Sequence, residues 1–130
     1  MIETPVKSRR ERTLEILTGF TGAIFIFAGL FKLAGIEEWA VRFDAWDYPH
    51  LFQLAIGGIE LVGGVMLMFR KLSSLVAVGL GVLMVGAIYT HVARGAAIYA
   101  LVPLMVIALL AVVGITRWPE ALGRAERQAS

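Results

Sequence analysis

The stretch LFQLAIGGIELVGGVMLMF, residues 51–69, decides the fold of this chain. It is almost wholly apolar, and as a helix it is long enough to cross a hydrocarbon core about 30 Å thick. It carries one charged residue, Glu60, near its middle. A charge at the centre of a bilayer costs about 2.5–3.5 kcal/mol on insertion scales, so Glu60 must be protonated, paired across helices or facing a polar cavity.

The rest of the chain has the same apolar character. Its 130 residues are 58% hydrophobic and its mean hydropathy is +0.78, which is too apolar for a water-soluble domain of this size. Three more apolar runs of similar length occupy residues 14–36, 72–92 and 98–115. We therefore predict one all-α transmembrane domain over residues 1–130, an antiparallel four-helix bundle with polar tails at residues 1–13 and 116–130.

Local patterns predict where some helices begin, bend and end. The sequence Ser8-Arg-Arg-Glu11 fits a capping box, so the first helix should begin before its apolar run. Pro103 lies inside the fourth run, where we expect it to bend the helix or loosen a turn near the outer side. Trp118 and Pro119 should close that span. The run at residues 14–36 is longer than the apolar region of a secretory signal, so we interpret it as a retained span.

A short helix is predicted between the first and second spans. Trp39, Phe43 and Trp46 recur there at helical spacing, with charged residues between them. Indole rings favour the depth of the lipid head groups, so this helix is expected to lie at the membrane interface.

The distribution of basic residues predicts the orientation in the membrane. A four-span threading leaves only Arg42 and Arg94 on one side and places nine basic residues on the other: Lys7, Arg9, Arg10, Arg12, Arg70, Lys71, Arg117, Arg124 and Arg127. Basic residues accumulate on the cytoplasmic side, so both termini are expected to be cytoplasmic. Aromatic residues do not alternate with the basic ones as on a nucleic-acid surface, so no nucleic-acid partner is expected.

The calculated depth of each residue in the membrane places three ionisable residues together in the outer half of the bundle. Lys32 lies about 6 Å and Glu60 about 13 Å below the outer ends of their spans at 1.5 Å per residue, and His91 lies at the outer end of the third span. Side chains lean toward the N-terminus of their helix, so the three side chains should converge. We take Glu60, Lys32 and His91 as candidates for proton transfer or ligand contact.

Gln53, Gly57 and Gly64 share the face of Glu60 and form a stripe of polar and small residues. Such a stripe faces protein or a cavity rather than lipid, so these three residues are candidates for ligand binding. The glycines could equally serve close helix approach, and a Lys32–Glu60 ion pair could simply hold the helices in register.

Several other chemistries find no support in these residues. The absence of cysteine removes thiol chemistry and iron–sulfur ligation by this chain. Neither a metal nor a haem is expected, because His50, His91, Asp47 and Glu60 include no close pair with a recognised ligand spacing.

The chain resembles the DoxX family of small bacterial four-helix membrane proteins. The resemblance rests on FAGLFKL at residues 27–33, on GGIELVGG at residues 57–64 and on a third span that ends in His91. It implies a multi-pass protein of the bacterial cytoplasmic membrane that works beside membrane-associated oxidoreductases. Quinone is the cofactor most compatible with the polar cluster, because its carbonyls can accept hydrogen bonds from lysine, histidine or glutamine.

Three functions remain open at this point. The chain could be a membrane subunit or anchor of a redox-associated complex, with a quinone or similar lipophilic ligand in an outer-half polar pocket. It could be a small membrane enzyme of the isomerase or hydratase type that uses Glu60 as acid and base. It could also be a structural or assembly protein in which Lys32 and Glu60 hold the bundle together. A homodimer is compatible with the apolar third and fourth spans but is not required.

Overall fold

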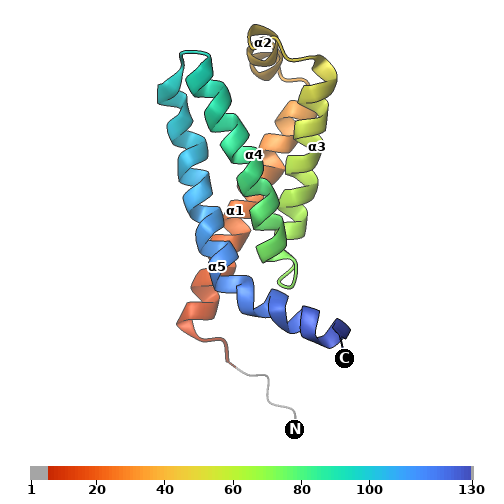
Figure 1. Ribbon diagram of the computed structural model, residues 1–130, viewed down its shortest axis with the longest axis vertical. Coiled ribbons are helices and arrows are strands. Elements are labelled where there is room, and N and C mark those ends of the chain that lie inside the picture. The colour runs from red at the N-terminus through yellow and green to blue at the C-terminus, as the bar shows by residue number, and fades with distance from the viewer. Residues whose placement is uncertain (1–5, 130) are drawn as a thin grey trace.

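The computed structural model describes residues 6–129, with residues 120, 121 and 123–129 described by their helical backbone alone. Helices account for almost all of this range, and no strand occurs within it. They are α1 (Arg9–Leu33), α2 (Glu37–Ala45), α3 (His50–Leu67), α4 (Ser73–Ala93), the short 3₁₀ helix η1 (Ala97–Ala100) and α5 (Leu101–Ala129), as labelled in Figure 1. The predicted all-α fold and the short helix after the first span are confirmed.

Four helical segments among the described residues are long and apolar enough to cross a membrane: Arg9–Leu33, His50–Leu67, Ser73–Ala93 and Ala97–Pro119. They lie within a few residues of the predicted spans. At the start of α1, the Ser8 hydroxyl oxygen accepts a hydrogen bond from the Glu11 N–H at 3.2 Å, as expected of a capping residue.

The end of α1 is defined by a glycine. Gly35 has a φ of +67°, in the left-handed region that glycine adopts without steric cost. Its N–H donates to the carbonyl of Lys32, and the N–H of Ile36 donates to the carbonyl of Phe31. This is the pattern of a Schellman motif, and it places Lys32 in the last turn of the helix.

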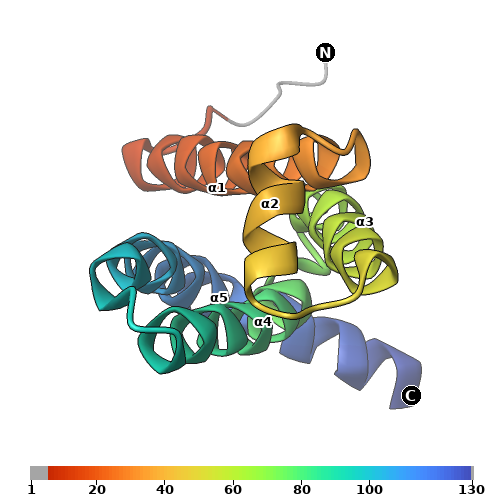
Figure 2. The same ribbon diagram turned by 90° about the horizontal axis from the view of Figure 1, so that it is seen from above.

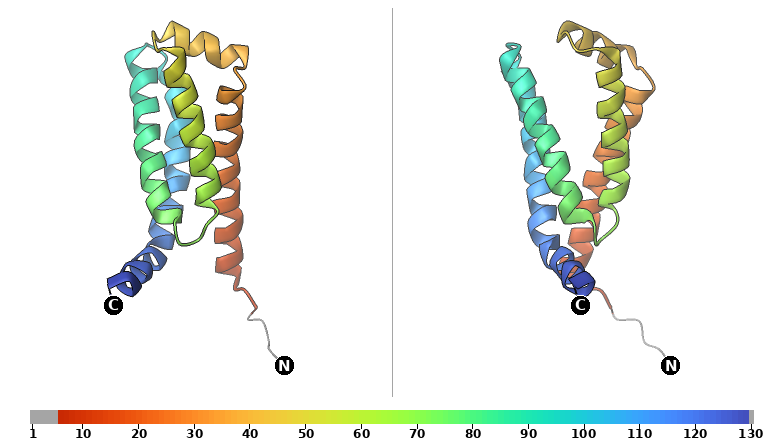
Figure 3. Two further views of the ribbon diagram at one scale, coloured as in Figure 1. Left: turned by 90° about the vertical axis from the view of Figure 1, so that its right-hand side faces the viewer. Right: turned by 45° about the vertical axis from the view of Figure 1, so that its right-hand side comes forward.

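The bundle consists of two helix pairs that diverge toward one end. α1 packs mainly against α3, and α4 packs mainly against α5. The pairs meet near the end that carries both termini and the α3–α4 loop, here called the terminal end, and separate toward α2 (Figure 3). The buried apolar core includes Phe25, Leu67, Ala77 and Val113, which join all four spans. Figure 2 shows α2 lying across the diverging end, here called the α2 end.

Glycines bring α1 and α3 into close contact. A Cβ added at Gly29 would lie 2.5 Å from the carbonyl oxygen of Gly57, and one added at Gly64 would lie 2.7 Å from the carbonyl oxygen of Gly22. Only glycine allows backbones to approach this closely. The glycine stripe on α3 therefore closes the α1–α3 interface, and it does not leave the empty volume that a ligand-binding stripe would require.

The two prolines of the fourth span lie toward its two ends. Pro103 lies in the first turn of α5, directly after the 3₁₀ turn η1, where a missing N–H breaks no helical hydrogen bond, so it accompanies an irregular turn and does not bend the helix interior. The apolar span ends at Pro119, as predicted, although the helix α5 continues past it to Ala129. The last part of α5 turns away from the bundle (Figure 1), as proline inside a helix commonly causes.

Candidate functional site

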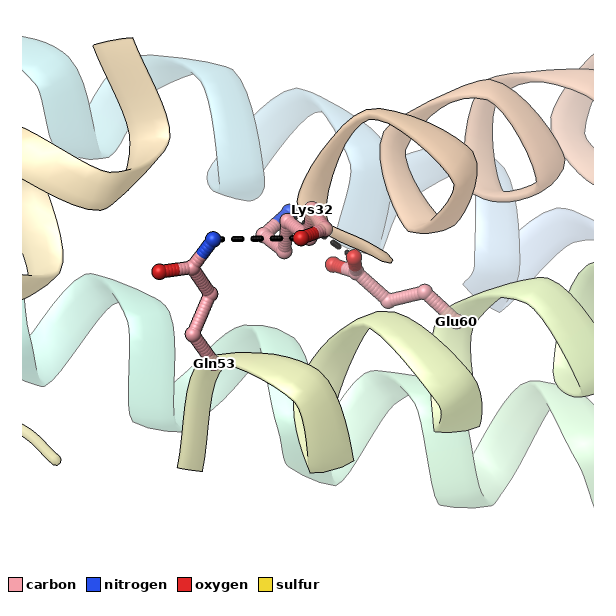
Figure 4. Close-up of polar contacts among 3 residues, drawn as sticks. All are labelled: Lys32, Gln53 and Glu60. Carbon is pink, nitrogen blue, oxygen red and sulfur yellow. Dashed lines mark hydrogen bonds and ion pairs between the residues drawn. The ribbon is translucent and has the colours of Figure 1, made fainter. Parts of the chain in front are cut away.

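A buried ion pair joins α1 to α3. Nζ of Lys32 lies 2.8 Å from Oε2 of Glu60, and the two side chains are only 6% and 5% exposed (Figure 4). The Schellman end of α1 places Lys32, and the glycine contacts hold α3 close enough for Glu60 to reach it. This confirms the predicted approach of the two residues and accounts for a carboxylate in the middle of an apolar span.

Gln53 supports this pair from one side. Its Nε2 donates a hydrogen bond of 3.1 Å to the backbone carbonyl of Lys32, as Figure 4 shows. That carbonyl belongs to the last turn of α1, where helical partners run out. Gln53 is 1% exposed, and its amide therefore holds the end of α1 against α3.

The short helix α2 covers the Lys32 side chain with aromatic rings. Nζ of Lys32 lies 4.0 Å from the ring centroid of Trp39, within the range of a cation–π contact. Phe43, the one fully buried residue of α2, contacts the rings of Trp39 and Trp46. The spacing that predicted an interfacial helix thus brings these aromatic side chains over the ion pair.

Trp46 connects α2 to the third span. Its ring meets His91 edge to face, with centroids 5.3 Å apart. Nδ1 of His91 is buried and has no hydrogen-bond partner among the residues that the structure describes. A buried imidazole nitrogen without a partner is costly, so His91 is held at this position by its ring contacts and not by a hydrogen bond from Nδ1.

Tyr48 makes a second connection from the α2 segment to α4. Its hydroxyl lies 2.8 Å from Oγ1 of Thr90, and Thr90 in turn donates to the carbonyl of Gly86 at 3.0 Å. The chain reaches this position through Asp47, whose φ of +62° ends α2 with a left-handed residue. Neither Tyr48 nor Thr90 was anticipated from the sequence.

These groups surround one cavity of about 680 Å³ between the diverging helix pairs. Lys32, Glu60 and His91 all line it, together with the α2 aromatics Trp39, Phe43 and Trp46. Its volume lies within the range of about 300–1,000 Å³ that is usual for small-molecule sites, and its mostly apolar walls with a few polar groups are typical of them.

The structure divides the candidate residues into two groups. Lys32, Glu60 and His91 meet at the cavity, whereas Gln53, Gly57 and Gly64 are not among its lining residues. Gln53 and the two glycines face α1 instead. Among the described residues, no three His, Cys, Asp or Glu side chains gather closely enough to hold a metal ion.

Comparison with known proteins places the chain in a family. The model of the DoxX-like family matches residues 16–113, a range that includes Lys32, Glu60 and His91, which all line the cavity. A protein of Bacillus subtilis (strain 168) named "Putative oxidoreductase CatD" is 35% identical over 75 residues. That match covers 58% of this chain and 56% of the relative, so the chain spans little more than half of the relative's length. No solved structure matches the chain.

Proposed function

Since the chain belongs to the DoxX-like family of membrane proteins, we propose that it is a membrane subunit or anchor of a redox-associated complex. In this proposal the cavity at the α2 end binds a quinone or a similar lipophilic carbonyl compound. The relative named as an oxidoreductase supports the redox association. The site itself is argued from this chain's own residues.

One observation carries the proposal: a large cavity with aromatic walls is lined by Lys32, Glu60 and His91. A ligand carbonyl can accept a hydrogen bond from the Lys32 ammonium or from a protonated nitrogen of the His91 imidazole. The rings of Trp39, Phe43 and Trp46 give a planar ligand aromatic walls to contact. A planar ring with carbonyl oxygens satisfies both features.

The ion pair has a defined part in this site. Lys32 is already held by Glu60 and by the face of Trp39, so its ammonium is positioned before any ligand arrives. Its remaining N–H can donate to a second ligand oxygen, while Glu60 balances the charge of Lys32. A bound quinone would supply electron-accepting chemistry, and the chain's own residues would hold its oxygens and exclude water.

We also propose an orientation for the site. The described basic residues gather at the terminal end, including Arg70 and Lys71 in the α3–α4 loop, whereas Arg42 and Arg94 lie at the α2 end. By the positive-inside rule the termini are cytoplasmic and the cavity opens in the outer half of a bacterial cytoplasmic membrane.

Ligand binding by purified protein tests the proposal. A short-chain benzoquinone should bind the wild type saturably, and His91→Phe should weaken its binding about tenfold or more, since the polar contact is lost while the contact with Trp46 is kept. Glu60→Gln should also weaken binding without unfolding the bundle. His50→Phe is the matched control, because His50 is exposed at the start of α3 and does not line the cavity.

A structural role is the second candidate, and the 2.8 Å Lys32–Glu60 pair favours it. Under this alternative the pair only fixes α1 against α3. The wild type would then show no saturable quinone binding, alone or with a partner oxidoreductase, while Glu60→Gln would still destabilise the protein.

A further inference from the structure

A second hollow runs along the outside of the bundle, on the seam between α3 and α4, with a volume of about 690 Å³. Its lining is wholly apolar and consists of aliphatic side chains, one methionine and glycines. Gly63 marks where the two helices touch, because a Cβ there would lie 2.8 Å from Cδ2 of Leu80. Gly58 and Gly79 leave space in the groove, since a Cβ added at either would meet no described atom within 4 Å.

This α3–α4 groove continues directly from the cavity. On α3, Ile56 lines the cavity and Ile59 lines the groove; on α4, Val82 lines the cavity and Gly79 lines the groove. Residues three apart are neighbours on one helix face. Because α3 and α4 run in opposite directions, both steps lead from the cavity toward the terminal end and so toward the middle of the membrane.

The cavity is open on this side. Val82 lines it and is nevertheless 69% exposed. On the α1–α5 side, Phe25 and Val106 are 1% and 8% exposed, and only Val102, nearer the start of α5, is exposed to a similar degree. A ligand in the cavity can therefore extend past Val82 into the α3–α4 groove, but not between α1 and α5 at the level of Phe25.

We infer that the α3–α4 groove holds the apolar tail of the ligand whose polar ring occupies the cavity. The ligand is then a ring compound with a long prenyl or alkyl chain, and this inference rests on the proposed function for the ring. The lining residues support this assignment, because ionisable side chains line the cavity and none lines the groove. From Ala55 to Met66 the groove follows α3 for about 16 Å at 1.5 Å per residue, room for a tail of substantial length.

Two quinones with the same ring, one without a tail and one with a decyl chain, provide the test in nanodiscs at a fixed lipid concentration. The wild type should bind the decyl quinone about tenfold more tightly than the tailless one, the size of effect that a few methylene groups produce in an apolar pocket. Gly79→Leu should remove most of this advantage and leave the affinity for the tailless quinone within about twofold.

Gly81→Leu is the matched control, because Gly81 lies on the same helix, meets no described atom within 4 Å and does not line the groove. It should leave both affinities unchanged. Gly58→Leu fills the opposite wall and repeats the test independently, should Gly79→Leu fail to fold.

The outcomes separate the two proposals. Failure of both quinones to bind the wild type overturns the proposed function and, with it, the tail assignment. Equal binding of the two quinones, or a tail advantage that survives Gly79→Leu and Gly58→Leu, overturns the groove assignment alone. A tail advantage that survives both substitutions is the result expected if acyl chains of the bilayer simply fill the groove.

Discussion

Breaking the Lys32–Glu60 pair should destabilise the bundle more than removing the pair altogether. Both side chains are about 5% exposed and their charged atoms are 2.8 Å apart, so each substitution alone leaves one buried charge without its partner. Loss of one member of such a pair costs about 3–5 kcal/mol, whereas replacing both by apolar residues of similar size is often nearly neutral. Lys32→Met and Glu60→Leu are suited to this cycle, because neither new side chain can replace the lost hydrogen bond.

The structure also predicts an asymmetry between the single variants. In Glu60→Leu the Lys32 ammonium keeps its contact with the Trp39 ring at 4.0 Å, whereas in Lys32→Met the Glu60 carboxylate loses its ion-pair partner. Lys32→Met should therefore be the more destabilising change. The double variant should recover most of that loss relative to the worse single variant, about 3 kcal/mol or more.

Unfolding in mixed detergent micelles, followed by circular dichroism, measures these differences. The exposed Arg42–Glu38 pair, which lies one helical turn apart on α2 at 2.9 Å, is the control cycle and should show coupling below about 0.5 kcal/mol. Additive losses for Lys32→Met and Glu60→Leu would refute the reasoning, since they would mean that the two charges do not interact.

Three other predictions test the architecture. Gly29→Ala should cost about 1–3 kcal/mol in the same unfolding assay, because its Cβ would lie 2.5 Å from a backbone oxygen of α3. In the control Gly19→Ala the new Cβ meets no described atom within 4 Å, so this variant should be neutral or stabilising. Equal effects of the two substitutions would contradict the close approach of α1 and α3. Tyr48→Phe should cost about 1 kcal/mol and speed hydrogen exchange in α2, because the bond to Thr90 is lost; unchanged exchange would show that the bond does not hold α2 in place. In a chain that has no natural cysteine, an impermeant thiol reagent applied to intact cells should label Ala45→Cys and not Ser8→Cys; the reverse pattern would overturn the orientation.

The Lys32–Glu60 pair was predictable because its determinants are local. Helical rise gave the depth of each residue, and the tilt of the Cα–Cβ bond gave the direction of each side chain. Four runs of nearly 20 apolar residues likewise predicted the spans without any knowledge of their packing. Each of these inferences needs only one helix at a time.

The features that escaped prediction depend on how helices meet. The role of Gly57 and Gly64 could not be chosen from sequence, because a glycine stripe is equally suited to a tight interface and to a cavity wall. The Tyr48–Thr90 bond joins residues 42 positions apart and requires α2 to cross the end of the bundle. The helices pack closely within each pair and much less between the pairs, and the cavity lies where the pairs separate. This arrangement is also a property of all four spans together.

The central claim, that a quinone binds between the helix pairs beneath α2, is tested most directly by tryptophan fluorescence. Of the three tryptophans, Trp39 and Trp46 line the cavity, whereas Trp118 lies at the far end of the fourth span and does not line it. Quinones quench indole fluorescence at short range. Trp118→Phe, which keeps the two cavity rings, should show quenching that saturates with quinone concentration. The double variant Trp39→Phe/Trp46→Phe, which keeps only Trp118, should show weak quenching that rises linearly as quinone dissolves in the membrane. Saturable quenching in this double variant, or the absence of saturable quenching in Trp118→Phe, would contradict the account.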